Sequence, residues 1–531
     1  MASSRADGPV VSAPAGAVRG RAEGALHVFK GIPYAAPPVG DLRWKPPAPM
    51  PAWQGVRDAL EFGAACIQPS RRITSIYASE IGATSEDCLT LNIWAPADAR
   101  NAPVFVWIHG GALSGGASKE MLYDGAHLAA RGVVVVSINY RLGVLGFLAH
   151  PELSAESPQG LSGNYGLLDQ IQALRWVHDN IAAFGGDAAN VTIAGESAGG
   201  LTVMYLMAAP DARGLFAKAI AESAYMVTAP TLKEARYGWP AAEAIGQGVA
   251  AAAHAQNIAE LRAMNAQTLV DTAASVQYFP FLSVDGHYVP RQLVEVFERG
   301  EQARVPLLAG FNSGEIRSLT VLAPPPPATA DEYERIIRER YGDLAGAFLQ
   351  QYPRANVQES IFATTRDALY GWTAERLARN QTAVGAPAYL YIFDHGYPAA
   401  DGANLHAFHA SELPYVFGTM DRTPPLWPRI PPTNRERALS DAMIGYWTSF
   451  ARTGQPEAAN APAWRPYGSD RAFMAFTDAP HPSARLLPGM FELHEEAVCR
   501  RRAANLAWNW NVGIISPPLG GANAACPSTS P

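Results

Sequence analysis

The stretch Val191-Thr-Ile-Ala-Gly-Glu-Ser-Ala-Gly-Gly200 contains the pattern on which the predicted fold depends. A β-prone run, Val191–Ala194, leads into a pentapeptide centred on Ser197, and a helix-capable segment, Leu201–Met207, follows at once. A strand, a tight turn and a helix in this order are the context in which a G-x-S-x-G turn exposes its serine as a nucleophile. Glycine two residues before and after the serine permits the close backbone approach that this turn requires. The pentapeptide alone would also fit a glycine-rich turn with an incidental serine.

Other apolar runs indicate that this strand belongs to a mostly parallel sheet with helices on both faces. Continuous β-branched runs are typical of central strands that are covered on both sides. Tyr165–Phe184, which separates two of the runs, has apolar residues at helical spacing, so strands and helices alternate as in α/β proteins. The predicted strands are Pro103–Ile108, Val133–Ile138, Val191–Ala194, Ala217–Ala221, Pro306–Gly310 and Ala388–Phe393, and residues 232–300 and 331–380 are predicted to be mainly helical.

Composition favours a large folded domain and argues against several classes of protein. The chain has 531 residues, of which 48% are hydrophobic and 17% charged, and this is ample material for a core. A net charge of −7 is mild for this length and argues against a nucleic-acid partner. No apolar run is long enough to span a bilayer, so we expect no stable membrane association. The spacing of histidines and cysteines does not indicate a metal site.

The four cysteines favour two disulfide bonds. We prefer the pairs Cys66–Cys88 and Cys499–Cys526, although four cysteines permit three pairings and four buried thiols are the alternative. Disulfides form in oxidising compartments. The first residues of the chain lack the apolar core of a signal peptide. We therefore expect a secreted or periplasmic protein whose signal peptide was replaced by a start methionine, with a cytoplasmic protein as the alternative.

A serine hydroxyl becomes a useful nucleophile only when a base removes its proton and an acid orients that base. In proteins with this serine turn, the acid and then the histidine follow the serine along the chain. Glu315 is the candidate acid because it lies in a turn just after the predicted strand Pro306–Gly310, although most glutamates are simply solvated. His409 is the candidate base. His395 and His406 are competitors that spacing alone does not exclude.

A third element of such a site stabilises the negative oxygen that forms during acyl transfer. The predicted strand Pro103–Ile108 ends in His109-Gly-Gly-Ala112, a type of loop that offers a backbone N–H to a developing alkoxide. The N–H of Ala198 is a second donor, because it directly follows Ser197 at a helix N-terminus. A Gly-Gly turn alone would mean little, but its place after a strand and before the serine turn indicates an oxyanion hole.

Together with these elements, a series of ordered motifs resembles the type-B carboxylesterases, a branch of the α/β-hydrolases. The resemblance spans residues 8–515 and implies one α/β-hydrolase domain, whereas the Gly, Ala, Ser and Pro content of residues 516–531 predicts a flexible tail. The motifs are Phe29-Lys-Gly-Ile-Pro-Tyr-Ala-Ala-Pro-Pro-Val-Gly40, Leu42-Arg-Trp44, Ser85-Glu-Asp-Cys-Leu-Thr-Leu-Asn92, Asn139-Tyr-Arg-Leu-Gly143, Gly163-Asn-Tyr-Gly-Leu-Leu-Asp-Gln170 and Phe184-Gly-Gly-Asp187.

The resemblance implies a serine carboxylesterase with a triad of Ser197, Glu315 and His409, which needs no metal or organic cofactor. Position for position, it also implies Gly111, Ala112 and Ala198 as the oxyanion donors; Ala112 stands where the family often has a third glycine. The loop closed by Cys66–Cys88 would line the entrance to the site. An ion pair between Arg43 and Glu86 is expected on the same ground.

Residues near the motifs also bear on the class of substrate. The loop between Cys66 and Cys88 lacks the tryptophan with which cholinesterases bind choline, so choline esters are not expected. Guanidinium groups bind carboxylates in a bidentate manner, so arginines near the motifs raise the hypothesis of carboxylate-bearing esters, with bulky esters as the other expectation. The arginines are Arg71, Arg72 and Arg317, and Leu113, Ser223, Tyr225 and Phe408 are further predicted substrate contacts.

The competing functional class is a binding or adhesion protein that keeps the fold without catalysis. An intact serine, acid and histidine set separates the two classes, and this chain has one. The same set serves amidases and lactonases, so the sequence does not separate these from esterases. The partner that we expect is a small ester; oligomeric state stays open.

Overall fold

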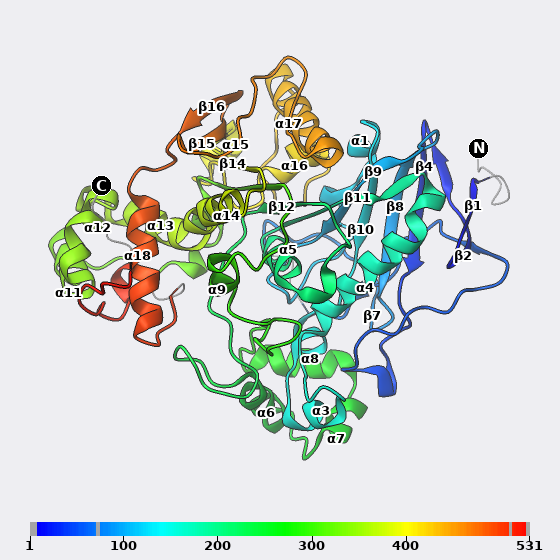
Figure 1. Cartoon of the computed structure of the whole chain (residues 1–531), viewed down its shortest axis with the longest axis horizontal. Coiled ribbons are helices and arrows are strands. Elements are labelled where there is room, and N and C mark those ends of the chain that lie inside the picture. Colours follow the sequence, from blue (N-terminus) through cyan, green and yellow to red (C-terminus); the bar gives the residue numbers. More distant parts are fainter. Residues whose placement is uncertain (1–7, 71–74, 509–511, 527–531) are drawn as a thin grey trace.

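A computed structural model describes residues 8–70, 75–508 and 512–526 of the chain, and an 11-stranded sheet runs through its centre. Figure 1 shows this twisted sheet with helices packed on it. In spatial order its strands are β16 (Pro480–Ala484), β15 (Ala472–Phe476), β14 (Ala388–Phe393), β13 (Leu307–Asn312), β12 (Lys218–Glu222), β11 (Gly186–Glu196), β9 (Ala102–Ile108), β10 (Val134–Ile138), β8 (Thr90–Pro96), β4 (Leu26–Pro33) and β3 (Arg21–Glu23).

The central strands of this sheet are parallel, as the sequence predicts. β10, β9, β11, β12, β13, β14 and β15 pair in parallel, whereas the pairs at the two edges are antiparallel. Each of the six predicted strands is present, and β14 has the predicted bounds. Short strands outside this sheet are β1 (Val10–Ala13), β2 (Gly16–Arg19), β5 (Val56–Asp58), β6 (Ala65–Cys66) and β7 (Thr84–Ser85).

Side-chain alternation along β9 explains why the sheet has a core on each face. Val104, Val106 and Ile108 join one buried cluster, whereas Phe105 and Trp107 join the other. Successive side chains of a strand point to opposite faces, so a continuous apolar run can fill two cores at once. The first cluster contains α4 (Tyr165–Asn180), α5 (Ala198–Ala208), α9 (Leu293–Glu298) and α14 (Trp372–Ala383), and the second contains α1 (Ala126–Ala129), α16 (Leu413–Phe417) and α17 (Asn434–Thr453).

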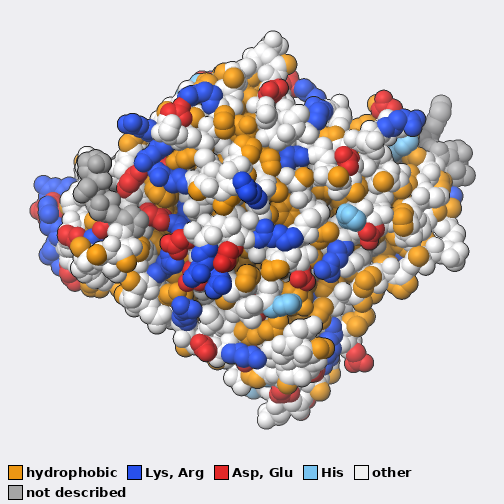
Figure 2. All heavy atoms as spheres, viewed as in Figure 1, with side chains coloured by type: hydrophobic (Ala, Val, Ile, Leu, Met, Phe, Trp, Pro, Cys, Tyr) orange, Lys and Arg blue, Asp and Glu red, His pale blue; other side chains and the backbone are white. Residues whose placement is uncertain are grey.

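Several of the remaining helices lie at the margins of the molecule. In Figure 1, α11, α12 and α18 lie at one end of the molecule, and α3, α6 and α7 lie together at the bottom. Figure 2 shows basic and acidic side chains interspersed on this face, in keeping with the mild net charge. The remaining helices are α2 (Gly143–Phe147), α3 (Pro151–Glu156), α6 (Ala242–Ala252), α7 (Ile258–Ala263), α8 (Ala266–Ser275), α10 (Glu315–Ser318), α11 (Ala330–Tyr341), α12 (Ala345–Gln351), α13 (Val357–Arg366), α15 (Pro398–Gly402) and α18 (Met490–Ala503).

Both preferred cysteine pairs are disulfide-bonded, Cys66 with Cys88 and Cys499 with Cys526. The second bond attaches the end of the chain to α18, and the backbone N–H of Leu519 donates to the carbonyl of Arg340 in α11. The described part of the predicted flexible tail is therefore held at two places. The preferred pairing of Cys499 with Cys526 predicts the first attachment, whereas the hydrogen bond of Leu519 to Arg340 depends on a partner far away in the sequence and has no local signal.

Two ion pairs fix the loops that precede the central helices. Arg43 contacts Glu86 at 2.7 Å, as the resemblance implies. Arg141 is deeply buried, and its guanidinium contacts both oxygens of Asp169 in α4, at 2.7 and 2.8 Å. The backbone N–H of Arg141 donates to the same carboxylate at 3.0 Å. Because neither charge can reach water, each depends on the other for compensation.

The variant Asp169→Asn should lower the free energy of unfolding by about 3–5 kcal/mol, because it leaves a buried arginine without its counter-charge. Urea unfolding followed by tryptophan fluorescence measures this. The matched control is Asp58→Asn, because Asp58 forms a more exposed pair with Arg19 at 2.8 Å. It should cost less than about 1 kcal/mol. Equal losses in the two variants would contradict the importance of the buried pair.

Candidate functional site

Ser197 occupies a sharp turn between β11 and α5. Its backbone has φ 57° and ψ −121°, a strained conformation for a residue with a side chain, and its N–H donates to the carbonyl of Glu222 at 2.9 Å. The turn requires glycine on its far side: a Cβ at Gly199 would lie 2.0 Å from the carbonyl oxygen of Ile108. The predicted strand, turn and helix are therefore present, and the strained serine stands at the end of the strand.

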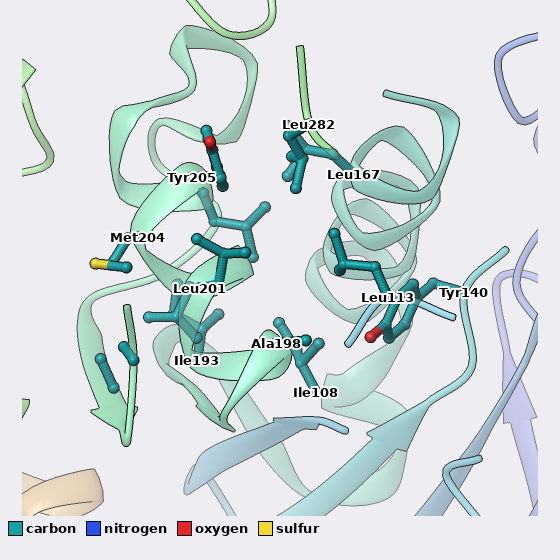
Figure 3. Packing of buried hydrophobic residues seen from close by; sticks show 14 of the residues in the cluster. Ile108, Leu113, Tyr140, Leu167, Ile193, Ala198, Leu201, Met204, Tyr205 and Leu282 are labelled. Atoms are coloured by element: carbon teal, nitrogen blue, oxygen red, sulfur yellow. The ribbon is translucent and has the colours of Figure 1, made fainter. Parts of the chain in front are cut away.

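The helix after this turn is packed into the core on all sides. Every residue of α5 is buried, and Figure 3 shows Ala198 and Leu201 against side chains from neighbouring elements. Leu113, from the loop after β9, points towards Tyr140 and α4 in the same view. Packing around α5 thus fixes both the serine turn and the glycine loop, because side chains from both segments share one core.

Glu315 and His409 come together although they are far apart in the sequence. Glu315 is the first residue of α10, follows β13 closely and is fully buried. Its Oε2 contacts Nδ1 of His409, and its Oε1 accepts hydrogen bonds from the N–H of Asn312 at 2.8 Å and the hydroxyl of Ser223 at 2.6 Å. With both oxygens occupied, the carboxylate has one orientation, which fixes the imidazole.

The competing histidines lie in other networks. His395 is buried, and its Nε2 contacts Glu436 at 2.7 Å. His406 is partly exposed and lies between Asp401, at 2.7 Å, and Asp394, at 3.2 Å. Of the three candidate histidines, His409 is the one that lines the same cavity as Ser197. Geometry therefore removes an ambiguity that spacing along the chain leaves open.

A second carboxylate, that of Glu196, faces the other nitrogen of His409. Its Oε1 lies 3.0 Å from Nε2, so the imidazole stands between two buried glutamates. Burial lowers the pKa of His409, but the charges of Glu196 and Glu315 outweigh this and raise the pKa to about 9. Burial raises the pKa of Glu196, and the neighbouring His409 opposes that rise. The two groups therefore favour each other's charged form at the inner wall of the site.

Two further buried carboxyl groups lie behind this pair. Glu222 accepts a hydrogen bond from the indole of Trp447 at 3.0 Å, and Glu412 accepts one from the side chain of Asn312. Burial raises the pKa of both groups, and their mutual repulsion with Glu196 adds to the effect. The sequence analysis did not assign roles to Glu222 or Glu412. The signal that could have identified Glu222 is its position, because it is an acidic residue at the carboxyl end of a parallel strand.

The glycine loop after β9 adopts a conformation that few residues tolerate. Gly111, Ala112 and Leu113 have φ values of 102°, 55° and 58°, respectively. A Cβ at Gly110 would lie 3.2 Å from the Cβ of Ser197, so the loop passes directly beside the serine. Gly111, Ala112 and Ala198 therefore present their backbone around Ser197, and Ala198 is the first residue of α5, where N–H groups lack partners within the helix.

Ser197 and His409 open into a cavity of about 810 Å³. A volume of this size holds a drug-sized molecule. Tyr225 lines the cavity, as predicted, and so do Gly111 and Ala112. Aromatic and aliphatic side chains surround its outer part, namely Trp239, Phe279, Phe281, Leu319, Val321 and Leu322.

Among the described residues, the other predicted substrate contacts are Leu113, Ser223, Arg317 and Phe408, and they do not line this cavity. Leu113 and Phe408 are packed in the core, where Phe408 contacts Trp427. Ser223 is fully buried behind Glu315. Arg317 donates to Glu359 at 2.6 Å and to Asn404 at 2.9 Å, so its charge is already compensated. Arg71 and Arg72 lie outside the described residues.

Comparisons with known proteins give one consistent result. A sequence model described as the carboxylesterase family matches residues 7–487. The fumonisin B1 esterase of Sphingopyxis macrogoltabida is 38% identical over 480 residues, covering 87% of this chain and 85% of that protein. The para-nitrobenzyl esterase of Bacillus subtilis is 38% identical over 464 residues, covering 86% and 92%.

Solved structures agree with the sequence comparisons. A thermophilic PNB esterase superposes with a TM-score of 0.79 at 33% identity, covering 91% of this chain and 99% of that one. A carboxylesterase from Geobacillus stearothermophilus superposes with a TM-score of 0.73 at 33% identity, covering 93% and 99%. The architecture is therefore the α/β-hydrolase fold of these enzymes.

The variant Glu196→Gln should shift the pH dependence of activity to lower pH. The base must be neutral to accept a proton, so kcat/KM rises as pH passes upward through the pKa of His409. Removing one of its two carboxylates lowers that pKa, and we expect the rising limb to move down by about 1 pH unit. A pH profile of kcat/KM measures the shift. Glu334→Gln, which changes a partly exposed carboxylate of α11 that pairs with Arg338, is the control and should leave the limb in place.

Proposed function

The chain belongs to the carboxylesterase family and is a carboxylic ester hydrolase, and we propose that it carries the acyl group on Ser197. The observation that carries this proposal is the contact of Glu315 with Nδ1 of His409 at the wall of the cavity into which Ser197 opens. An oriented histidine beside a strained, accessible serine is the arrangement that acyl transfer requires.

In the proposed reaction, His409 Nε2 takes the proton of Ser197 as the serine oxygen attacks the ester carbonyl. The N–H groups of Gly111, Ala112 and Ala198 stabilise the resulting alkoxide, and each such donor is worth roughly 3–4 kcal/mol in serine hydrolases. His409 then protonates the departing alcohol. Water repeats the sequence on the acyl-enzyme and releases the acid. Glu315 holds the imidazole and stabilises its positive charge throughout.

Glu196 has a role in the resting enzyme under this proposal. Its Oε1 lies 3.0 Å from Nε2 of His409, the nitrogen that takes the proton of Ser197 in the proposed reaction. A fixed negative charge beside Nε2 also favours the imidazolium that forms in each half-reaction.

The variant Ser197→Ala should lower kcat for para-nitrophenyl acetate by roughly 10⁶-fold, to background, because no other group then carries the acyl intermediate. Release of para-nitrophenol measures this. Ser157→Ala, a change at the end of α3, is the control and should keep full activity. Turnover that persists in the Ser197 variant would contradict the proposal, provided that its urea midpoint matches that of the unchanged chain.

We further propose bulky, apolar esters as the preferred substrates. The outer cavity is rimmed by apolar side chains, of which Phe279 is 41% and Val321 is 89% exposed. Exposed apolar groups gathered around one opening favour an apolar ligand. No described lining residue is a lysine or arginine, whereas Glu120 and Glu196 are acidic. The hypothesis of carboxylate-bearing esters therefore rests on Arg71 and Arg72 alone.

Two other predictions concern the setting of the enzyme. The similar proteins are named as ester hydrolases, so they do not favour the alternative that this chain is a binding protein. Two disulfides support export to an oxidising compartment, secreted or periplasmic, which we propose as its location. Within the described ranges, no helix has the length and apolar character needed to cross a bilayer.

The variant Val321→Ser should lower kcat/KM for para-nitrophenyl octanoate about fivefold and change that for the acetate less than twofold. A long acyl chain loses apolar contact at the rim, a loss of about 1 kcal/mol, whereas a short one does not reach it. Val276→Ser is the matched control, because Val276 is 48% exposed and does not line the cavity. Equal losses for both esters would contradict a role of the rim in selection.

A further inference from the structure

The segment between Cys66 and Cys88 touches the base directly through Tyr77. The hydroxyl of Tyr77 lies 3.0 Å from the carbonyl oxygen of His409 and 2.6 Å from the hydroxyl of Ser318. A carbonyl oxygen can only accept, so Tyr77 donates to His409 and accepts from Ser318. One side chain thus joins the backbone of the proposed base to α10, the helix that begins with the proposed acid.

The ring of Tyr77 also restrains the imidazole. It stands edge-on to the ring of His409, with centroids 6.3 Å apart at 82°. Tyr370 contacts the imidazole too, with centroids 5.5 Å apart, and Tyr77 packs in turn on Trp427 at 5.9 Å. Aromatic contacts of this kind contribute about 0.5–1.5 kcal/mol each beyond area burial. The histidine is therefore held by its main chain, its Nδ1 and its ring.

The same segment contacts the loop proposed as the oxyanion hole. The side-chain amide of Gln68 donates to the carbonyl of Gly116 and accepts from the N–H of Gly116, both at 3.0 Å. Gly116 packs closely on His109, at the base of this loop: a Cβ there would lie 2.6 Å from Nδ1 of His109. Gln68, near one end of this disulfide-closed segment, and Tyr77, in its middle, thus reach two separate parts of the site.

We propose that Tyr77 is a positioning residue, which sets the place of His409 relative to Glu315 by joining the His409 carbonyl to Ser318. This inference rests on the proposed role of His409 as the base. Tyr77 takes no part in proton transfer, because its hydroxyl donates to a main-chain oxygen rather than to a reacting atom. Its contribution is to the rate of the chemical step, because a small displacement of a catalytic group costs much of the advantage of proximity.

The test is Tyr77→Phe, which keeps the ring and removes only the hydroxyl. We expect kcat for para-nitrophenyl acetate to fall about tenfold while KM changes less than twofold. The control is Tyr446→Phe in α17, because the hydroxyl of Tyr446 also donates to a main-chain oxygen, that of Pro462 at 2.6 Å. The control should keep kcat within twofold. Equal kcat in the two variants would overturn the inference.

A second variant decides the question if Tyr77→Phe does not fold. Ser318→Ala leaves the ring and hydroxyl of Tyr77 in place and removes its link to α10, so kcat should fall about threefold at unchanged KM. Unchanged kcat in this variant would also overturn the inference. The Ser197→Ala measurement keeps the two proposals separate. If activity is lost in Ser197→Ala but kcat is normal in both the Tyr77 and the Ser318 variants, positioning by Tyr77 is refuted. The proposed esterase mechanism is then unaffected.

Discussion

The parallel register of the central sheet is the constraint on which the site depends. Glu196 pairs with Glu222, and Glu222 pairs with Gly310, so the ends of β11, β12 and β13 lie side by side. Because parallel strands end at a common edge, residues that follow them meet there even when more than a hundred positions separate them in sequence. Ser197, Ser223 and Glu315 each follow one of these strands by a few residues. The proposed nucleophile, the proposed acid and the serine that supports this acid thus come from one feature of the backbone.

Buried negative charge is the second organising feature of this edge. Four glutamates, Glu196, Glu222, Glu315 and Glu412, are each at most 3% exposed and lie near one histidine. Such a group of carboxyls is costly to bury, and burial and mutual repulsion keep protons on some of its members. The remaining charge favours the protonated imidazole. The buried carboxylates therefore stabilise the protonated form of His409, which acyl transfer needs transiently. They do so at the expense of the neutral form of His409, which starts the reaction.

Sequence patterns predicted the strands and the candidate catalytic residues better than they predicted which side chains surround the site. Apolar runs identified the six strands, and the motifs pointed to Ser197 and His409, which line one cavity, and to Glu315, which contacts His409 from the core. Proximity to a motif was a poor guide to substrate contact: Leu113 and Phe408 point into the core, because neighbouring residues of a loop face different directions. The contacts of Glu196 and Tyr77 with His409 depend on side-chain directions and on long-range loop placement, which local patterns do not contain.

The order of strands in the sheet also bears on how the chain reaches its native state. β9 lies between β10 and β11, and the last parallel strand, β15, is added from the C-terminal part of the chain. Parallel pairing between distant segments closes large loops before it brings any stabilisation, and such topologies fold slowly. The segment that carries His409 follows β11 and β13 in the chain, and it completes the carboxyl edge of the sheet only when those strands are in place. Growth of esterase activity during refolding would therefore report the meeting of the ends of β11 and β13 with the segment that carries His409, rather than the formation of any one early folded part.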